Sequence, residues 1–183
     1  MDTLTGKLLI ASPRLDDPNF GQSVVLVVHH EREGAFGLVL NRPGNDRLAS
    51  VWTQVVEEPC PLDVPILVGG PLEGPLMALH GEPDRSEIEV VPGVHFARRK
   101  EALVDLVSGA KEPLRVFVGY SGWSRGQLEG EIERGDWTLT DATPALVFGE
   151  EGSMWRRARR HAADEAIVSA LHIKHVPERP WHN

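Results

Sequence analysis

Short apolar runs alternate with amphipathic stretches along the chain. The apolar runs are rich in β-branched and aromatic residues and are bounded by glycine, proline or polar turn signals, a pattern typical of β-strands. Because the polar segment between residues 23–30 and 35–41 is short, these two runs are predicted to form an antiparallel hairpin within a sheet. The predicted strands are residues 8–11, 23–30, 35–41, 66–68, 76–80, 87–91, 94–97, 114–118, 137–140 and 145–148, with 66–68 paired to 76–80.

Four stretches have the three-and-four spacing of an amphipathic helix. Asn45 or Asp46 could cap the first, and an alanine-rich stripe along the last predicts close packing on a sheet. Since strands and helices interleave irregularly, we expect a single α+β domain with a mostly antiparallel sheet flanked by helices, covering residues 1–175. A loose C-terminal tail follows at 176–183. The predicted helices are residues 48–56, 98–108, about 125–134 and 153–173.

A glycine-rich corner joins the strand at 114–118 to the helix that follows it. Gly119 and Gly122 allow backbone angles that are closed to other residues. Ser124 and Gln127 have the spacing of a capping box, in which each side chain bonds the backbone amide of the other residue. We therefore expect the helix to begin near residue 125, with Glu131 and its neighbouring glutamates turned away from the apolar face.

Charge and cysteine content exclude several classes of protein. The formal net charge of -8 disfavours general binding to nucleic acid, a polyanion. Cys60 is the only cysteine, so an intramolecular disulfide and a thiolate metal cluster are excluded, as suits a reducing compartment. The apolar segment near the N-terminus is too short for a signal peptide, and no aliphatic run is long enough to span a bilayer. These features predict a cytoplasmic protein.

One basic cluster has two interpretations. Arg98, Arg99 and Lys100 occupy the first turn of a predicted helix, where positive charge opposes the helix dipole. A solvated basic turn is the simpler interpretation, and contact with an anion or a partner is the alternative.

The segment from Gly119 to Trp123 is similar to the G-x-S-x-G nucleophile elbow of serine hydrolases, with Ser121 as the nucleophile. Trp123, however, stands where the second glycine would lie, so a structural corner is the competing interpretation. His29 and His30 are adjacent on a strand and point to opposite faces. His172 and His175 share a predicted helix face but have no Cys, Asp or Glu nearby at a ligand spacing. We expect no metal and no cofactor.

Five groups of motifs, in order along nearly the whole chain, resemble those of the YqgE/AlgH family. The resemblance implies a compact α+β fold and a cytoplasmic bacterial protein, without an established reaction. Some family members carry the label of transcriptional regulator. The family usually has alanine where this chain has Ser121, which implies that this hydroxyl is dispensable. The matching segments are G-K-L-L-I-A-S-P (6–13), D-P-N-F with S-V-V-L (17–26), G-A-F-G-L-V-L-N-R-P (34–43), V-G-G-P with Leu79-His80, and V-F-V-G-Y-S-G-W with G-Q-L-E-G-E-I (116–132).

The sequence favours a non-catalytic binding or regulatory module over a hydrolase using Ser121 or a transcriptional regulator. We expect its partner to be a protein or a small polar or anionic ligand, with neither a membrane nor nucleic acid bound directly. Arg42 and an exposed Trp123 are predicted to flank one surface depression, and the glycine corners are predicted to converge there. The predicted binding residues are Asn41, Arg42, Gly69, Gly70, His80, Tyr120, Ser121, Trp123 and Gln127.

Overall fold

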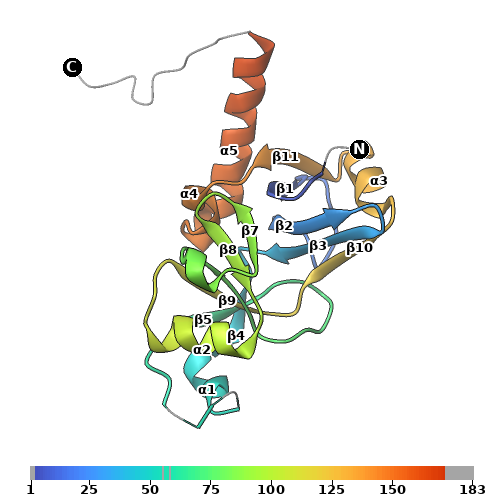
Figure 1. Cartoon of the computed structure of the whole chain (residues 1–183). Coiled ribbons are helices and arrows are strands. Elements are labelled where there is room, and N and C mark those ends of the chain that lie inside the picture. The colour runs from blue at the N-terminus through green and yellow to red at the C-terminus, as the bar shows by residue number, and fades with distance from the viewer. Residues whose placement is uncertain (1–2, 55, 58, 172–183) are drawn as a thin grey trace, which may run out of the picture.

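Two β-sheets pack against each other in the computed structural model, which describes residues 3–54, 56–57 and 59–171. Figure 1 shows the two sheets next to each other, with helices on their outer faces and beside the place where the sheets meet. One sheet has five strands in the order β10-β3-β2-β1-β11, and the other has six in the order β4-β5-β9-β6-β8-β7. The strands are β1 Lys7–Ala11, β2 Val24–Glu31, β3 Gly34–Val39, β4 Pro43–Arg47, β5 Pro65–Val68, β6 Met77–His80, β7 Ile88–Val91, β8 Val94–Ala97, β9 Leu114–Val118, β10 Ser121–Ser124 and β11 Trp137–Asp141.

The five-stranded sheet is entirely antiparallel, and the predicted hairpin of β2 and β3 lies inside it. Residues 24–28 of β2 are all buried, because both faces of this strand are covered. Leu8 and Leu26 face the second sheet, whereas Leu9 and Val25 face the opposite side. Alternation along each strand thus supplies two separate cores from one sheet.

The six-stranded sheet has one parallel pair, β5 with β9. β9 also pairs antiparallel with β6, so it separates β5 from β6. The predicted pairing of 66–68 with 76–80 is therefore wrong. After β5 the chain turns away through Gly69 and Gly70, and Leu72 forms a bridge with Tyr120. The edge of β5 therefore stays open for pairing with β9.

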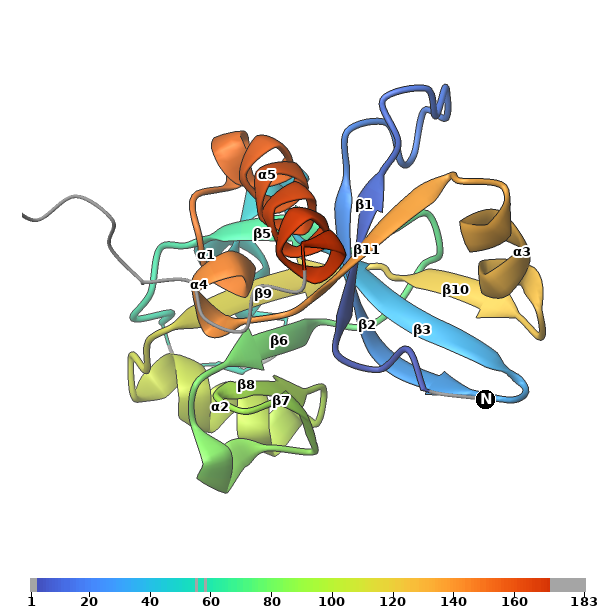
Figure 2. The ribbon, with the colours of Figure 1, turned by 90° about the horizontal axis from the view of Figure 1, so that it is seen from above.

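Five α-helices and one short 3-10 helix complete the described part of the chain. α1 and α2 cover the outer face of the six-stranded sheet, and Figure 2 shows α3 beside β10 on the far side of the five-stranded sheet. The α-helices are α1 Leu48–Trp52, α2 Lys100–Ser108, α3 Gln127–Glu133, α4 Pro144–Val147 and α5 Glu151–Ala170, and the 3-10 helix η1 is Pro83–Arg85.

Three local predictions need correction. Residues 145–148 form part of helix α4 and its end, because the Thr143 side chain accepts from the Leu146 amide and Pro144 occupies the first turn. Asn45 and Asp46 do not cap α1, since they lie in strand β4. α3 begins at Gln127, and only half of the capping box forms: the Gln127 side chain accepts from the Ser124 amide.

α5 packs its N-terminal half on the five-stranded sheet and extends beyond it. Met154, Ala158 and Ala162 are buried in the core between the sheets, so the predicted alanine-rich stripe packs closely only in this half. Its continuation at Ala166 and Ala170 is exposed, and there the prediction is wrong. Figure 1 shows the C-terminal half rising clear of both sheets, and Ile167 there is 56% exposed. The predicted tail at 176–183 lies outside the described residues. Among the described helices, none combines the length and apolar composition needed to cross a bilayer.

Arg115 links the two sheets to the start of α5. Its guanidinium donates to the Leu40 carbonyl at 3.1 Å and to the Gly149 carbonyl, and it pairs with Glu151 at 2.9 Å. The side chain is only 10% exposed, so these acceptors replace water around a buried charge. This structural role has no local sequence signal, because the acceptors come from distant segments.

Candidate functional site

The predicted glycine corners do converge, but through their backbones. The Gly69 amide donates to the Val118 carbonyl at 2.9 Å, and its carbonyl accepts from the Val39 amide at 2.8 Å. Leu72 and Tyr120 exchange two backbone hydrogen bonds of 3.0 and 2.9 Å. The corners therefore form the junction where strands of the two sheets meet.

Close backbone approach explains two of the glycines. A Cβ on Gly69 would lie 2.3 Å from the Gly119 carbonyl oxygen. Because this oxygen belongs to the backbone, it cannot move aside to relieve the clash. Gly119 itself has φ +69°, and its Cβ would lie 2.8 Å from the Leu72 carbonyl oxygen. Gly69 and the adjacent Gly70 are buried, so the corner presents backbone to backbone and little surface to a ligand.

Ser121 is fully buried at this junction. Its hydroxyl donates to the Gly69 carbonyl at 3.2 Å, which joins the two corners. A catalytic serine must meet its substrate with a free lone pair and a base within reach. Ser121 instead behaves as a small residue that satisfies a neighbouring carbonyl.

Trp123 is buried as well, with 6% of its side chain exposed, so the expectation of an exposed tryptophan rim is wrong. β10 pairs with β3, and alternation along β10 turns Trp123 toward α3. Its indole nitrogen donates to the Glu131 carboxylate at 2.8 Å. Glu131, predicted to point away from the apolar face, therefore closes this core.

Arg42 lies elsewhere, in a separate hollow of about 310 Å³. This hollow is formed by the β4 segment together with Ile66, Val68 and Val118, and Trp123 does not line it. Arg42 and Trp123 thus do not flank one depression. Strand order decides this, since β4 and β10 belong to different sheets.

Two further predicted site residues make local structural bonds. The Asn41 side chain accepts from the Val24 amide at 2.9 Å and donates to the Gln22 carbonyl at 2.9 Å. Gln127, besides its bond to Ser124, donates to Glu131 at 3.0 Å. Both side chains stabilise turns around the five-stranded sheet.

His80 is fully buried on the face of β6 that packs toward α2. Its Nδ1 accepts from the Glu82 amide at 3.2 Å, whereas its Nε2 has no hydrogen-bond partner among the described residues. The ring stacks on His95 of β8 with a centroid separation of 5.8 Å. Burial lowers the pKa of His80 to about 4, and the charge of His95 acts in the same direction.

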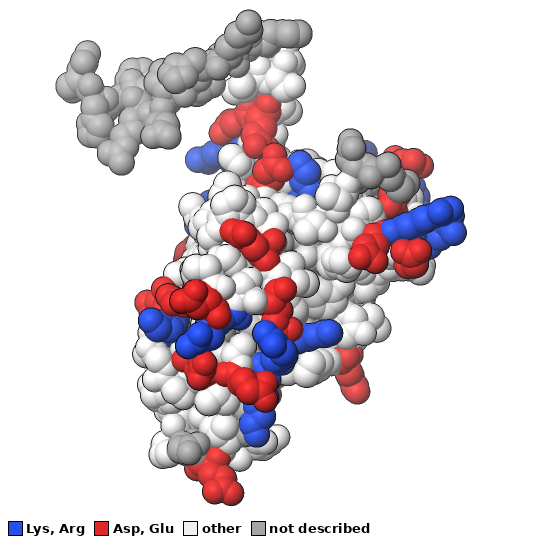
Figure 3. Space-filling view, viewed as in Figure 1, with Lys and Arg blue, Asp and Glu red and all other residues white. Residues whose placement is uncertain are grey.

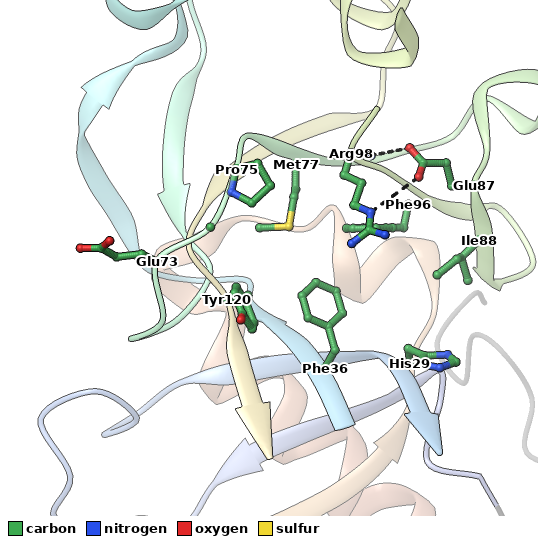
Figure 4. A pocket seen from close by; sticks show the side chains of 11 residues that line it. His29, Phe36, Glu73, Pro75, Met77, Glu87, Ile88, Phe96, Arg98 and Tyr120 are labelled. Atoms are coloured by element: carbon green, nitrogen blue, oxygen red, sulfur yellow. Dashed lines mark hydrogen bonds and ion pairs between the residues drawn. The ribbon is translucent and has the colours of Figure 1, made fainter. Parts of the chain in front are cut away.

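A pocket of about 750 Å³ opens between the two sheets (Figure 4). Phe36 projects into it from β3, Met77 and Phe96 face it from β6 and β8, and Tyr120 borders it at the junction. The Phe36 ring centroid lies 5.6 Å from that of Phe96 and 5.3 Å from that of Tyr120. The walls therefore consist of aromatic and aliphatic side chains from both sheets.

Arg98 and Glu87 border one edge of this pocket. Figure 4 shows the Arg98 side chain extending toward Phe96 and Ile88, with Glu87 beside it. Glu87 accepts from the amides of Arg98 and Arg99, each at 2.7 Å. Burial tends to raise the pKa of the Glu87 carboxyl, but these two bonds and the nearby arginines outweigh it and hold the pKa below its ordinary value.

Of the nine predicted binding residues, Tyr120 alone lines this pocket. The sequence marked Phe36, Met77 and Phe96 only as buried strand positions. It did not mark them as pocket residues, because strands far apart in sequence create a pocket between sheets. Arg98 carried a weak signal, since a cation at a helix start suggested contact with an anion. Among the described residues, no three His, Cys, Asp or Glu side chains are grouped to hold a metal ion.

A family model described as AlgH-like matches residues 8–166. The chain belongs to the AlgH-like family. It is 36% identical to a UPF0301 protein of Chlorobaculum tepidum over 97% of this chain and 95% of that protein. A UPF0301 protein of Paracoccus denitrificans is also 36% identical, over 94% of this chain and 97% of the relative. The resemblance found in the sequence motifs is thus confirmed.

Solved structures agree on the fold of this AlgH-like protein. The solution structure of AlgH from Pseudomonas aeruginosa matches with a TM-score of 0.73 and 29% identity, covering 97% of this chain and 96% of AlgH. A crystal structure from Corynebacterium diphtheriae matches with a TM-score of 0.71 over 88% of this chain and 87% of that protein. At 22% identity the second match shows the fold alone. The expected α+β fold with mostly antiparallel strands is confirmed.

Proposed function

We propose that this AlgH-like protein is a non-catalytic binding module whose ligand occupies the pocket between the sheets. The observation that supports this most directly is an opening of about 750 Å³ walled by three aromatic rings. Small-molecule sites typically enclose about 300–1,000 Å³ and combine apolar walls with a few polar groups. The ligand we propose is a small molecule with an apolar body that packs against the ring cluster of Phe36, Phe96 and Tyr120.

The chemistry of the lining favours binding over catalysis. The described lining residues include neither serine, threonine nor cysteine, and their acid–base groups are His29, Glu73, Glu87 and the Tyr120 phenol. In the described part of the chain no hydrogen bond joins two of these four side chains. Glu87 already accepts two backbone N–H groups, and His29 pairs with Glu31 at 3.0 Å. Ser121, the candidate nucleophile, is buried outside this pocket. A reactive pair facing a bound ligand is thus missing from the described lining.

We place the protein in the bacterial cytoplasm, where the fraction of the module that has ligand bound would follow the ligand's concentration. The lone cysteine and the bacterial relatives support this proposal. Direct reading of DNA is less well supported, because the net charge is -8 and Figure 3 shows basic and acidic side chains interspersed on the face that it views.

A fragment screen by ligand-detected NMR tests the proposal. Hits on the parent protein should be weakened in Phe36→Ala and retained in Phe20→Ala. The two phenylalanines are matched, because both are half-buried members of aromatic clusters, but only Phe36 lines the pocket. A screen in which Phe36→Ala keeps every hit would overturn the assignment of this pocket.

A further inference from the structure

We propose that the pocket selects organic acids, with Arg98 binding the carboxylate while the rings hold the apolar body. This inference rests on the proposed function and adds the chemical class of the ligand. Arg98 lies just before α2, and Figure 4 shows its guanidinium above the pocket beside Phe96.

The guanidinium of Arg98 is available for such a ligand. Its Nε lies 3.9 Å from the nearer Glu87 oxygen, which is too long for a hydrogen bond. Among the described residues its side-chain N–H groups have no hydrogen-bond acceptor, and the side chain is 68% exposed. Five donors in a planar fork match the two oxygens of a carboxylate.

The backbone of Arg98 is nevertheless held in place at the pocket edge. Its backbone amide and that of Arg99 both donate to Glu87, which is only 16% exposed, so the start of α2 is tied to the pocket edge. Both amides bond Oε1 of Glu87, whereas its Oε2 lies 3.9 Å from the Arg98 Nε as a long ion pair. The other acidic lining residue, Glu73, points away from the rings in Figure 4. An incoming carboxylate would therefore share the Arg98 guanidinium with Glu87 Oε2, which is too distant to take up its N–H donors.

An apolar acid satisfies both parts of the pocket at once. Its body would pack against the pocket side of Phe36 and Phe96, which already contact each other edge to face, and aromatic rings meet such a surface edge to face or offset. Its carboxylate would remain at the mouth, where a charge keeps contact with water and avoids the cost of burial. A neutral molecule with the same body would gain only the first contribution.

Arg99 offers a matched control. Its Nε lies 3.6 Å from Glu87 and its side chain is 67% exposed, close to the values for Arg98, but it does not line the pocket. Glutamine at either position removes one positive charge near the same carboxylate. Only the change at Arg98 removes the proposed ligand contact.

The experiment compares 2-naphthoate with 2-naphthalenemethanol, which share the ring system and differ in the carboxylate. Isothermal titration should show naphthoate binding about tenfold more tightly to the parent, a charge-assisted contact reduced by solvent. Arg98→Gln should abolish this difference, and Arg99→Gln should preserve it. Equal affinity of the parent for both probes, or an equal loss in both variants, would overturn the role of Arg98 while leaving the pocket as a binding site. Failure of both probes to bind would count against the pocket itself.

Discussion

Two aromatic clusters lie on opposite faces of the five-stranded sheet, and they differ in how they are closed. Phe20, Trp123 and Trp137 lie on the face covered by α3, with the Phe20 centroid 6.2 and 5.5 Å from the two indole rings. Phe36 lies on the other face, against Phe96 and Tyr120 at the open pocket. We call these the closed cluster and the open cluster.

The difference lies in what covers the rings. Glu131 of α3 accepts from the indole nitrogens of both Trp123 and Trp137 at 2.8 Å, so the closed cluster has its polar atoms satisfied. A second contact holds α3 to strand β2 through His30. Because His30 Nδ1 accepts from the Leu4 amide, its Nε2 carries the proton and donates to Glu129 of α3 at 3.0 Å. The open cluster is bordered by Arg98 and Glu87 and has space for a ligand. Aromatic content alone thus does not identify a binding site.

The largest expected difference in stability is between Trp123→Ala and Phe36→Ala. Trp123 is buried in the closed cluster, so its removal should lower the free energy of unfolding by about 3–5 kcal/mol. Phe36 borders open space, and its removal should cost about 1–2 kcal/mol, because less packing is lost. Urea denaturation measures both. Equal losses would show that the two clusters are equally structural.

Removing the shared acceptor of the closed cluster should cost somewhat less. Glu131→Ala leaves two largely buried indole N–H groups without their carboxylate, which should lower the free energy of unfolding by about 2–3 kcal/mol. Glu133→Ala is the control, since Glu133 is exposed on the same helix. The same denaturation experiment applies. A Glu131 variant as stable as the Glu133 variant would mean that the indoles find other partners.

His80 sharpens the contrast between satisfied and unsatisfied buried groups. Its pKa falls from 6.5 to about 4 on folding, so between these pH values the unfolded chain binds a proton that the folded chain does not. Stability should therefore decline as the pH falls from 6.5 to 4, by on the order of 2 kcal/mol, with no further contribution from His80 below that range.

Denaturation across this pH range should show a shallower decline for His80→Gln, which keeps an acceptor for the Glu82 amide and does not titrate. His161→Gln is the control, because it makes the same substitution at a side chain that is 39% exposed. Parallel slopes in the parent and His80→Gln would exclude His80 as the source of acid sensitivity.

Local patterns predicted most strands and the long helix, since their signals lie within one segment. The β2–β3 hairpin and the buried alanines of α5 follow directly from periodicity. Periodicity did not predict that β5 pairs with β9, because β9 lies in a distant part of the chain. Residues 145–148 were misread since Thr143 and Pro144 serve equally as a turn and as a helix start.

The candidate site was harder to predict for the same reason. Trp123 is hidden only because α3 returns Glu131 to it, and the corner sequence alone could not show that. Tyr120 was predicted on the strength of its corner, whereas Phe36 and Phe96 became pocket residues only through the packing of two sheets. Sequence periodicity marks which residues avoid water, but the gap left between distant strands depends on tertiary packing.

The methionine methyl groups provide the most direct test of the central claim that a ligand binds between the sheets. The chain has three methionines, of which Met77 lines the pocket and Met154 is buried against the α5 side of the core. With methyl-labelled methionine, and Met77→Leu to assign the signal, titration with 2-naphthoate should shift the Met77 resonance progressively to saturation and leave that of Met154 unmoved. A Met77 resonance that stays in place while naphthoate binds, or a Met154 resonance that moves alone, would contradict the account.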